Sequence, residues 1–518
     1  MTPLFEPPER FHLADYLLTE RLREGAGDRV ALAIPGSEIT YAQIDDLARR
    51  WASVLTEIGV RPEERVLIAL PDGLDFVAAL FGVLHAGAVV VMVNPDLEAE
   101  RLADLMEYSR AACAVVDERV LPAFAAAAAA TDRPPRIVTP AAGRTAHPSF
   151  ESLDPGAGGA YEGPGTHRDD PAIWLFSGGT TGRPKAVVQT HRSFANTTEL
   201  YAKAALGYSR DDVTLSVPKL FFGYATGSNL FFPFAVGATA VLFPERATPE
   251  RLFELIESRR PTLLVNVPTM VRKMVAHPQA SERDLSCLRF ATSAGEALPA
   301  PLYHRWKETF GVELLDGLGT AEMWHIFLSN LPGAVRPGTL GRVVPGFEID
   351  VRDPEGRPLP PGEVGRLWVR GASRALGYWR NLPKTAEAFR GEWFVGGDLV
   401  VRDEEGWVTY CGRSDDVLKV GGKWLAPQEV ESCLMRHPAV AECAVVGAED
   451  ADGLIKPTAF VVRAAGAGAD DLEETLKAWV LEHLQPYKHP RRVVVLDELP
   501  RTHLGKADRA KLKRLAGA

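Results

Sequence analysis

Cysteine is scarce in this chain. Its 518 residues contain five, Cys113, Cys287, Cys411, Cys433 and Cys443. None forms a Cys-x-x-Cys pair or stands with histidines at the spacing of a metal site. The sequence therefore argues against a disulfide scaffold and against a structural zinc site. A reducing compartment fits this cysteine usage, and we expect a cytoplasmic protein.

The chain also lacks a surplus of positive charge. It has 58 Lys and Arg residues against 68 Asp and Glu residues, which gives a formal net charge of −10. Nucleic-acid binding needs clustered basic residues, so we expect no nucleic-acid partner. With 46% hydrophobic and 24% charged residues, the composition is typical of a folded globular protein. At about 100 to 200 residues per domain, the length predicts more than one domain.

Signals for export or membrane insertion are lacking as well. Residues 1–10 carry three prolines and two glutamates, which is unlike the basic and apolar regions of a signal peptide. Residues 76–93 contain no Asp, Glu, Lys or Arg, but the run divides at residues 85–87. The first part, 74–84, has a helical pattern and the second, 88–93, is β-branched. We therefore predict a buried helix followed by a buried strand, and no membrane partner.

Apolar, β-branched runs recur between helical patterns along the first half of the chain. Runs that are apolar on both faces and alternate with helices predict an α/β fold with a largely parallel, covered sheet. The runs are residues 66–70, 88–93, 112–116, 238–243 and 262–265.

The pattern of predicted secondary structure changes beyond residue 340. Short alternating strands at 347–351, 365–369 and 407–410 predict a small antiparallel β unit. After about residue 412, the chain runs helix, strand, helix, strand and ends in a basic segment. We therefore predict a large N-terminal domain over 1–414, made of α/β sheets and the small β unit, and a separate α+β C-terminal domain over 415–518.

The strongest local motif is residues 177–185, Ser-Gly-Gly-Thr-Thr-Gly-Arg-Pro-Lys, which follow an apolar run. Glycines and hydroxylated residues let a loop curl so that its N–H and O–H groups face phosphate oxygens, with a lysine to neutralise charge. It is not a Walker A loop, because Pro184 precedes Lys185 and Ala186 follows it. Taken alone, the segment is also compatible with a flexible turn.

This segment resembles the phosphate-binding signature of the adenylate-forming superfamily, which includes acyl-CoA synthetases, carrier-protein adenylation domains and luciferases. Further segments match in the family's order and spacing, and chance does not account for six such matches. These segments are Gly-Glu-Ala-Leu-Pro at 295–299, Asp-Gly-Leu-Gly-Thr-Ala-Glu at 316–322, Trp-Phe-Val-Gly-Gly-Asp at 393–398, Gly-Arg-Ser-Asp-Asp at 412–416 and Pro-Arg-Thr-His-Leu-Gly-Lys at 500–506. The resemblance covers nearly the whole chain and implies a large N-terminal domain with a small mobile C-terminal domain.

The resemblance implies attack of a substrate carboxylate on the α-phosphate of ATP, giving an acyl-adenylate and pyrophosphate. Charge then builds on phosphate oxygens, where a lysine and Mg²⁺ are the usual means of stabilising it. By resemblance, Glu322 binds the magnesium ion and Lys506 reaches the carboxylate and the α-phosphate. The loop residues that face the phosphates are Ser177, Thr180, Thr181, Gly182 and Lys185. The alternative for Lys506 is a solvated lysine in a basic tail.

The nucleoside contacts are implied in the same way. Asp398 would accept hydrogen bonds from both ribose hydroxyls, and Arg413 would add a cationic contact. The adenine would lie along the backbone of Gly295, Glu296 and Ala297, with Asp316 near its amino group. An Asp beside two glycines is otherwise most often a turn residue.

The chain departs from the family at one important position. Ala321 stands where the family has the threonine before Glu322, which removes a hydroxyl used on the α-phosphate. Thr320, one place earlier, is the candidate replacement, and the sequence leaves open whether it compensates. A slow enzyme or a ligand-binding homologue therefore stays an alternative.

The second half-reaction needs a thiol. The resemblance implies that the C-terminal domain swings about Asp415, which removes Lys506 from the site. Gly421 and Gly422 would then line a tunnel for a pantetheine arm, because such an arm passes closely only over backbone without Cβ atoms. Lys419 would touch the adenylate from the same loop. For the two glycines, a simple turn is the alternative.

The acyl pocket resembles that of the benzoate-CoA ligase branch, notably in Lys-Leu-Phe-Phe-x-Tyr at 219–224 and Glu-Met-x-His-Ile-Phe-Leu-Ser-Asn at 322–330. Small residues above and below an aromatic side chain form a slot for one planar ring. The implied pocket residues are Gly223, Tyr224, Ala294, Gly319, Ile326 and Leu331. Gly223 and the apolar Leu331 leave room beside the ring, which favours benzoate or 2-aminobenzoate (anthranilate). The alternative is that the aromatic residues of this region are ordinary core residues; they are Phe221, Phe222, Tyr224 and Phe231.

The sequence thus predicts an aryl-CoA ligase that uses ATP, Mg²⁺ and coenzyme A. The nearest rival is a stand-alone enzyme that adenylates an aryl acid and loads the phosphopantetheine of a separate carrier protein. The sequence leaves monomer and homodimer open.

Overall fold

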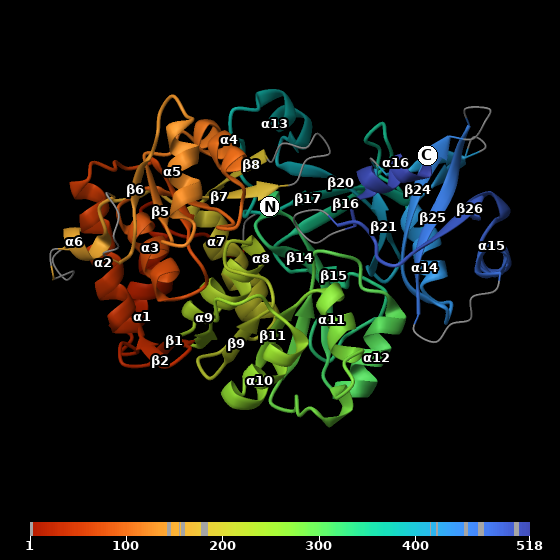
Figure 1. The fold of residues 1–518 in the computed structure, drawn as a ribbon, viewed down its shortest axis with the longest axis horizontal. Coiled ribbons are helices and arrows are strands. Elements are labelled where there is room, and N and C mark those ends of the chain that lie inside the picture. The colour runs from red at the N-terminus through yellow and green to blue at the C-terminus, as the bar shows by residue number, and fades with distance from the viewer. Residues whose placement is uncertain are drawn as a thin grey trace.

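The structure is a computed structural model, and it describes residues 4–141, 147–154, 156, 161–177, 185–414, 416–420, 423–449, 454–464, 471–501 and 507–517. Two large sheets and their helices form the body of the molecule, and a C-terminal unit lies at one end (Figure 1).

The first sheet has seven strands, and its central strands are parallel. In spatial order they are β18 (Gly377–Tyr378), β8 (Lys185–Thr190), β7 (Pro171–Ser177), β4 (Val89–Met92), β3 (Arg65–Ala69), β5 (Cys113–Val116) and β6 (Arg136–Val138). Only the β18–β8 and β8–β7 pairs are antiparallel. Strands β4 and β5 are buried along their whole length, as their unbroken apolar sequences predict.

The second sheet has nine strands and is parallel except near its two edges. In order they are β15 (Arg342–Val343), β14 (Ile326–Ser329), β13 (Leu314–Gly319), β12 (Phe290–Ser293), β11 (Leu263–Asn266), β9 (Val213–Ser216), β10 (Thr239–Val241), β1 (Val30–Ile34) and β2 (Ser37–Thr40). All five apolar runs named above form strands in these two sheets, so the prediction of a largely parallel α/β body is confirmed.

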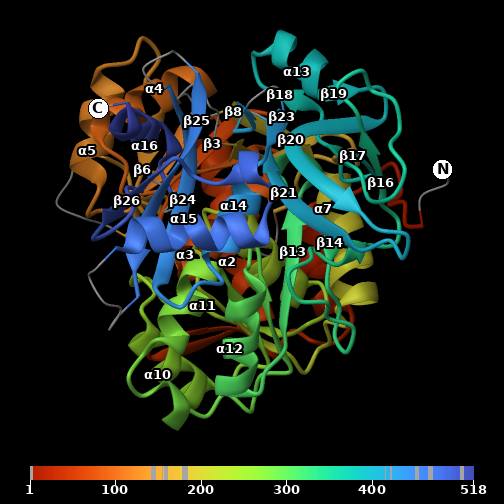
Figure 2. The same cartoon turned by 90° about the vertical axis from the view of Figure 1, so that its right-hand side faces the viewer.

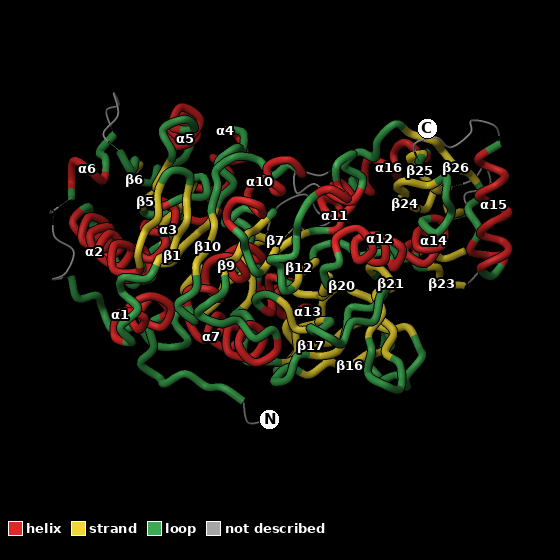
Figure 3. The backbone as a smooth tube through the Cα atoms, turned by 90° about the horizontal axis from the view of Figure 1, so that it is seen from below, coloured by secondary structure: helices red, strands yellow, loops and turns green. Residues whose placement is uncertain are grey.

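Helices cover both sheets (Figures 1 and 3). They are α1 (Glu20–Arg23), α2 (Tyr41–Glu57), α3 (Leu74–His85), α4 (Ala99–Ser109), α5 (Leu121–Ala129), α6 (Phe150–Leu153), α7 (His191–Thr197), α8 (Gly223–Thr226), α9 (Phe232–Phe234), α10 (Pro249–Arg259), α11 (Pro268–Val275) and α12 (Ala300–Phe310). Helices α2 and α3 pack closely at Gly82, where a Cβ would lie 2.4 Å from the Cβ of Trp51. Only glycine permits that approach.

The run 76–93 forms α3 and then β4, which confirms the predicted helix followed by a strand. Within the part of the chain that the structure describes, no helix combines the length and apolarity that crossing a membrane requires.

The small antiparallel unit is also confirmed. Its strands are β16 (Glu348–Arg352), β17 (Val364–Arg370), β20 (Trp393–Arg402) and β19 (Phe389–Arg390), with β21 (Val408–Arg413) paired to β20. Helix α13 (Leu382–Ala388) joins this unit to β18 of the seven-stranded sheet.

The C-terminal unit faces the viewer in Figure 2. Its elements are β22 (Leu418–Val420), β23 (Lys423–Leu425), α14 (Pro427–Leu434), β24 (Val440–Glu449), β25 (Ile455–Arg463), α15 (Leu472–His483), β26 (Arg492–Leu496) and α16 (Arg509–Ala516). Helix α14 packs on β21, and Arg272 of α11 lies 3.7 Å from Glu442 of β24. The boundary between residues 414 and 415 stays a prediction, because Asp415 lies outside the described residues.

Candidate active site

Lys185, Glu322 and Tyr378 meet beside the edge of the seven-stranded sheet. The Tyr378 hydroxyl donates a hydrogen bond of 2.8 Å to Glu322 Oε1, and both side chains are buried. The ammonium group of Lys185 lies 4.8 Å from the centre of the Tyr378 ring. A carboxylate, a phenol and a cation from distant parts of the sequence therefore form one cluster.

Backbone contacts hold these residues in place. Strand β18 pairs with β8 so that Tyr378 lies opposite Val187. Glu322 lies in a 3₁₀ turn (Ala321–Met323) whose start is capped by Thr320 Oγ1, which accepts the Met323 N–H at 3.2 Å. The Gln189 side chain donates to the carbonyl of Ala321 at 2.6 Å. The hydroxyl of Thr320 thus has a local role in shaping this turn.

The electrostatics of the cluster follow from its burial. Desolvation lowers the pKa of Lys185, while the carboxylate of Glu322 opposes that change. Burial and the neighbouring Glu322 raise the pKa of Tyr378, so its phenol stays protonated at neutral pH and can donate to the carboxylate. Arg413 also acts on both groups through its charge.

The two ends of the predicted phosphate loop are adjacent. Ser177 ends β7 and lies opposite Lys185, the first residue of β8. Thr180, Thr181 and Gly182 lie outside the described residues.

Asp398 and Arg413, the predicted ribose contacts, form a pair across β20 and β21. They are opposite each other in the strand register, and Arg413 Nη1 lies 3.2 Å from Asp398 Oδ1. A Cβ at Gly397 would lie 2.6 Å from a nitrogen of the Arg413 guanidinium. The glycine before Asp398 therefore leaves the space that the guanidinium occupies.

The predicted adenine contacts lie at the ends of β12 and β13. Ser293 is opposite Asp316 in the register, and Ala294 to Ala297 follow β12 directly. Gly295 has a φ of +90°, and the Glu296 carboxylate accepts a hydrogen bond from Thr269 at 2.9 Å. Burial raises the pKa of Asp316 well above its usual range.

Asp316 also has an unused polar atom. Its Oδ1 and the Oγ of Ser293 are buried and make no well-formed hydrogen bond to a described residue, although Ser293 interacts with Asp316 and partly offsets the rise of its pKa. Buried polar atoms in proteins almost always have partners. These two incompletely bonded groups could accept or donate a hydrogen bond to a polar ligand group.

Tyr224 is tied to its surroundings at both ends. Its hydroxyl lies 2.7 Å from Thr292 Oγ1, and its carbonyl lies 3.0 Å from His325 Nε2. The same His325 nitrogen is 3.0 Å from Ser228 Oγ. Burial lowers the pKa of His325 to about 4, so this imidazole is neutral at pH 7.

Two glycines shape the space beside Tyr224. A Cβ at Gly223 would lie 3.2 Å from Leu175 and 3.3 Å from Trp324. A Cβ at Gly319 would lie 2.2 Å from the carbonyl oxygen of His325, so only glycine fits there. Trp324 and His325 both have positive φ values, 42° and 72°, a conformation that non-glycine residues rarely adopt.

Most of the predicted pocket residues therefore gather in one place. Gly319 pairs with Ile326 across β13 and β14, and Gly223 and Tyr224 lie against Trp324 and His325. Leu331 lies beyond the end of β14, forms a bridge with Ala334 and packs against the same hydrophobic core as Tyr224.

The structure adds four residues to the predicted site: Thr292, Trp324, His325 and Tyr378. Three of them stand within or beside segments already singled out in the sequence. Tyr378 carried no comparable signal, because a Gly-Tyr-Trp triplet alone predicts no contact with a glutamate 56 residues away.

An aspartate anchors the segment that carries Gly223 and Tyr224. Asp72 Oδ1 accepts the Leu220 N–H at 2.9 Å, and Lys219 Nζ donates to the Phe243 carbonyl at 2.7 Å. Burial raises the pKa of Asp72 to about 6 and lowers that of Lys219 to about 8, and each charge partly offsets the other's shift. This anchor links the loop after β3 to the loop after β9.

The remaining predicted residues cannot be placed. Lys506, Asp415, Gly421 and Gly422 lie outside the described residues, and Lys419 belongs to β22 but its side chain is not described.

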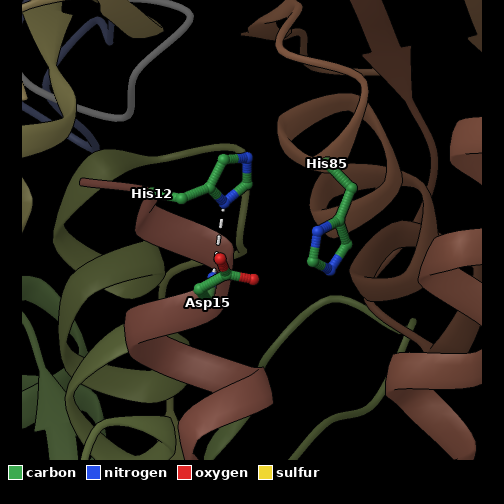
Figure 4. Close-up of side chains that lie close together, drawn as sticks. All are labelled: His12, Asp15 and His85. Atoms are coloured by element: carbon green, nitrogen blue, oxygen red, sulfur yellow. Dashed lines mark hydrogen bonds between the residues drawn. The ribbon is translucent and has the colours of Figure 1, made fainter. Parts of the chain in front are cut away.

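A second cluster of potential metal ligands lies elsewhere, where the N-terminal segment packs on α3 (Figure 4). His12, Asp15 and His85 place ligand atoms within 4.8 Å of one another. However, His12 Nε2 lies 2.9 Å from the Leu84 carbonyl and its Nδ1 accepts the Asp15 N–H at 3.4 Å. Both ring nitrogens are therefore engaged, and we assign this cluster to packing.

Comparison with known proteins places the site in context. The AMP-binding enzyme family matches residues 19–379, and the AMP-binding enzyme C-terminal domain matches residues 429–506. The chain is 41% identical to a benzoate-CoA ligase of Thauera aromatica over 99% of this chain and 97% of that protein. It is 35% identical to an anthranilate-CoA ligase of Pseudomonas aeruginosa over 93% of this chain and 92% of that one.

A solved structure is similar as well. It is an anthranilate CoA ligase in complex with anthranoyl-AMP, with a TM-score of 0.93 and 36% identity, and the match covers 99% of this chain and 98% of that one.

Proposed function

This chain belongs to the AMP-binding enzyme family, and on that premise we propose that it is an aryl-CoA ligase of the AMP-forming, acid-thiol type. The substrate is benzoate or a substituted benzoate such as 2-aminobenzoate. Its carboxylate attacks the α-phosphate of ATP to give aryl-AMP and pyrophosphate, and the thiol of coenzyme A then displaces AMP. Relatives named for these two acids, at 35% and 41% identity, support this assignment.

One structural observation carries the proposal: β13 and the turn after it hold residues suited to each part of an acyl-adenylate. Asp316 lies within the strand, Gly319 ends it opposite Ile326, and Glu322 lies in the following 3₁₀ turn. The unpaired Oδ1 of Asp316 suits the adenine amino group. We place the aryl ring beside Gly319 and the phosphates beside Glu322.

The ring pocket is matched to a flat acid. Tyr224 and the glycine backbone at Gly223 and Gly319 border the slot, and Ile326, Ala294 and Leu331 complete our assignment. Planar rings pack well between an aromatic side chain and a surface without Cβ atoms. Gly223 keeps this wall of the slot flat, because an added Cβ would come within 3.2 Å of Leu175 and 3.3 Å of Trp324.

Charge on the phosphates is met by Lys185 and by the phosphate loop that begins at Ser177 and includes Thr180, Thr181 and Gly182. Glu322 suits a magnesium ion, because it is a buried carboxylate and carboxylate oxygens are ligands that Mg²⁺ prefers. When bound, the ion would offset negative charge on the phosphate oxygens. Thr320 is the hydroxyl nearest in sequence to the missing threonine, but it already caps the 3₁₀ turn.

The nucleoside and the mobile domain complete the assignment. Asp398 and Arg413 bind the ribose, and the backbone at Gly295, Glu296 and Ala297 borders the adenine. Lys506 contacts the carboxylate and α-phosphate during adenylation. Rotation about Asp415 then withdraws it, while Lys419, Gly421 and Gly422 approach the site for thioester formation.

Two alternatives are less well supported. Loading of a carrier protein is not favoured, because relatives aligned over nearly the full length are named as CoA ligases. A ligand-binding homologue is not favoured either, since Lys185, Glu322 and Asp398 are all present and contact the side chains of Tyr378 or Arg413. The unpaired cysteines support a cytoplasmic location.

Mass spectrometry of the reaction products tests the proposal. The purified protein is incubated with ATP, Mg²⁺ and a pool of aryl and aliphatic acids, with and without coenzyme A. An aryl-CoA that appears only when coenzyme A is present supports the assignment and identifies the ring. Aryl-AMP that accumulates despite coenzyme A would instead favour a carrier protein, and no pyrophosphate release with any acid would favour the ligand-binding homologue.

A further inference from the structure

The hydrogen bond between Tyr378 and Glu322 joins two elements that the sequence keeps far apart. Tyr378 stands in β18, at the edge of the seven-stranded sheet, and Glu322 stands in the turn after β13 of the nine-stranded sheet. The distance of 2.8 Å is that of a well-formed O–H to carboxylate contact. Both residues are buried, with 7% and 5% of their surface exposed.

The direction of this bond is fixed by chemistry. An ionised carboxylate only accepts hydrogen bonds, so the phenol must be the donor. The bond therefore engages Oε1 of Glu322 and holds the carboxylate in one orientation.

The ring of Tyr378 has a second contact. Lys185 places its ammonium group 4.8 Å from the ring centre, within the range of a cation–π interaction. One tyrosine thus contacts the carboxylate through its hydroxyl and the cation through its ring. Tyr378 therefore links Glu322, which we assign to magnesium, with Lys185, which we assign to the phosphates.

We propose that Tyr378 is a positioning residue for adenylation: its hydroxyl orients Glu322 for magnesium binding, and its ring supports Lys185 beside the phosphates. This inference rests on the proposed function, because it takes the roles of Glu322 and Lys185 from it. A carboxylate held in one orientation binds a metal ion without first losing side-chain freedom.

The hydroxyl is not needed to hold β18 in place. The backbone N–H of Leu376 donates to Val188 at 3.0 Å, and that of Trp379 donates to Ala186 at 2.9 Å. The Tyr108 hydroxyl donates to the Trp379 carbonyl at 2.7 Å. Tyr378→Phe should therefore fold normally, keep the ring under Lys185 and lose only the bond to Glu322.

The test measures metal binding directly. Mn²⁺ replaces Mg²⁺, and its affinity for the full-length protein with a non-hydrolysable ATP analogue is measured by electron paramagnetic resonance. A hydrogen bond to a charged group corresponds to about a tenfold change or more in an equilibrium constant. We expect Tyr378→Phe to weaken Mn²⁺ binding about tenfold and to raise the Mg²⁺ concentration needed for pyrophosphate release to a similar degree.

Two further variants separate the possible causes. Tyr108→Phe removes the hydrogen bond to the Trp379 carbonyl, next to β18, but does not change the contacts of Glu322. This variant should therefore keep wild-type Mn²⁺ affinity. Glu322→Gln should weaken Mn²⁺ binding more than Tyr378→Phe does.

Wild-type Mn²⁺ affinity in Tyr378→Phe, or equal losses in Tyr378→Phe and Tyr108→Phe, would overturn the inference. Unchanged Mn²⁺ binding in Glu322→Gln would instead refute our assignment of the metal ligand, which is a failure of the proposed function.

Discussion

Tyr224 and Thr292 come from different elements and join their hydroxyl oxygens at 2.7 Å. Tyr224 lies in the short helix α8, whereas Thr292 lies in β12, one of the parallel strands of the nine-stranded sheet. The contact fixes the one aromatic side chain that we place against the substrate ring. The position of the Tyr224 ring, and with it the width of the aryl pocket, therefore depends on β12 in the middle of the sheet.

Replacing Thr292 by valine tests this relationship. The change keeps the shape of the side chain but leaves the Tyr224 hydroxyl without this partner, so the ring gains freedom to move. We expect the KM for the aryl acid to rise by about three- to tenfold, as for the loss of one hydrogen bond, with the KM for ATP unchanged. Steady-state kinetics with each substrate varied in turn measures both.

Thr214→Val is a matched control for that variant. Thr214 lies in β9 of the same sheet, and its buried hydroxyl has no hydrogen-bond partner among the described residues. It should leave both KM values near wild type. Similar rises in both KM values for Thr292→Val would contradict a role confined to the aryl pocket.

Gly223 sets the space available to a ring substituent. A methyl group at this position would meet Leu175 at 3.2 Å and Trp324 at 3.3 Å, which is tight but short of a severe clash. Gly223→Ala should therefore fold and narrow the pocket. Because one small group in an apolar pocket changes binding by about 1 to 3 kcal/mol, we expect kcat/KM for an ortho-substituted benzoate to fall at least about tenfold relative to benzoate.

A competition assay with benzoate and 2-aminobenzoate, measured by mass spectrometry, gives the ratio of the two kcat/KM values in a single reaction. Gly27→Ala is a suitable control, because its added Cβ would make only ordinary contacts of 3.6 and 3.8 Å. If the ratio of kcat/KM values is unchanged in Gly223→Ala, the ring substituent must contact another wall of the pocket.

Much of the fold followed from the sequence because its strands are buried on both faces. Runs such as residues 88–93 are apolar throughout and rich in β-branched residues, which is typical of a strand in a covered parallel sheet. The candidate site rests on a different signal: motifs such as residues 316–322 keep their spacing within one strand and the turn after it.

Contacts between distant segments could not be predicted in this way. Tyr378 meets Glu322, and Asp72 meets Leu220, only because two sheets pack together. No local pattern encodes such a contact, since each residue is unremarkable within its own segment. The place of Leu331 in the pocket stays a prediction, because this residue lies beyond the end of β14, where it forms a bridge with Ala334.

The buried Asp72 predicts a pH dependence of stability. Its pKa is raised from 3.8 to about 6, so between these values the folded protein retains a proton that the unfolded chain has released. The free energy of unfolding contributed by this group therefore falls as pH rises through that window. Asp72→Asn removes the titration while its amide oxygen can still accept the Leu220 N–H.

The measurement is urea unfolding of both proteins at pH 4 and at pH 6.5. Between these values, the wild type should lose about 2 kcal/mol of stability relative to Asp72→Asn, from a shift of roughly two pKa units at 1.36 kcal/mol each, reduced because the titration is incomplete within this pH range. Parallel pH profiles for the two proteins would show that Asp72 titrates normally.

Lys506 allows the two half-reactions to be separated. If this lysine acts only in adenylation, Lys506→Ala should slow formation of aryl-AMP from ATP and acid by a hundredfold or more, by about the measure of losing one charge-stabilising donor. The same variant should convert supplied aryl-AMP and coenzyme A to aryl-CoA at close to the wild-type rate. That result is expected because the proposed domain rotation about Asp415 would remove Lys506 before the thiol attacks.

Lys513→Ala is the matched control, since it removes a lysine from α16 in the same C-terminal unit; it should leave both half-reactions intact. Single-turnover assays with supplied aryl-AMP measure the second step without the first. Loss of both half-reactions in Lys506→Ala would mean that this lysine remains at the reacting atoms throughout. The proposed rotation of the C-terminal domain between two states would then be wrong. An unchanged adenylation rate would instead support the alternative that Lys506 is a solvated lysine in a basic tail.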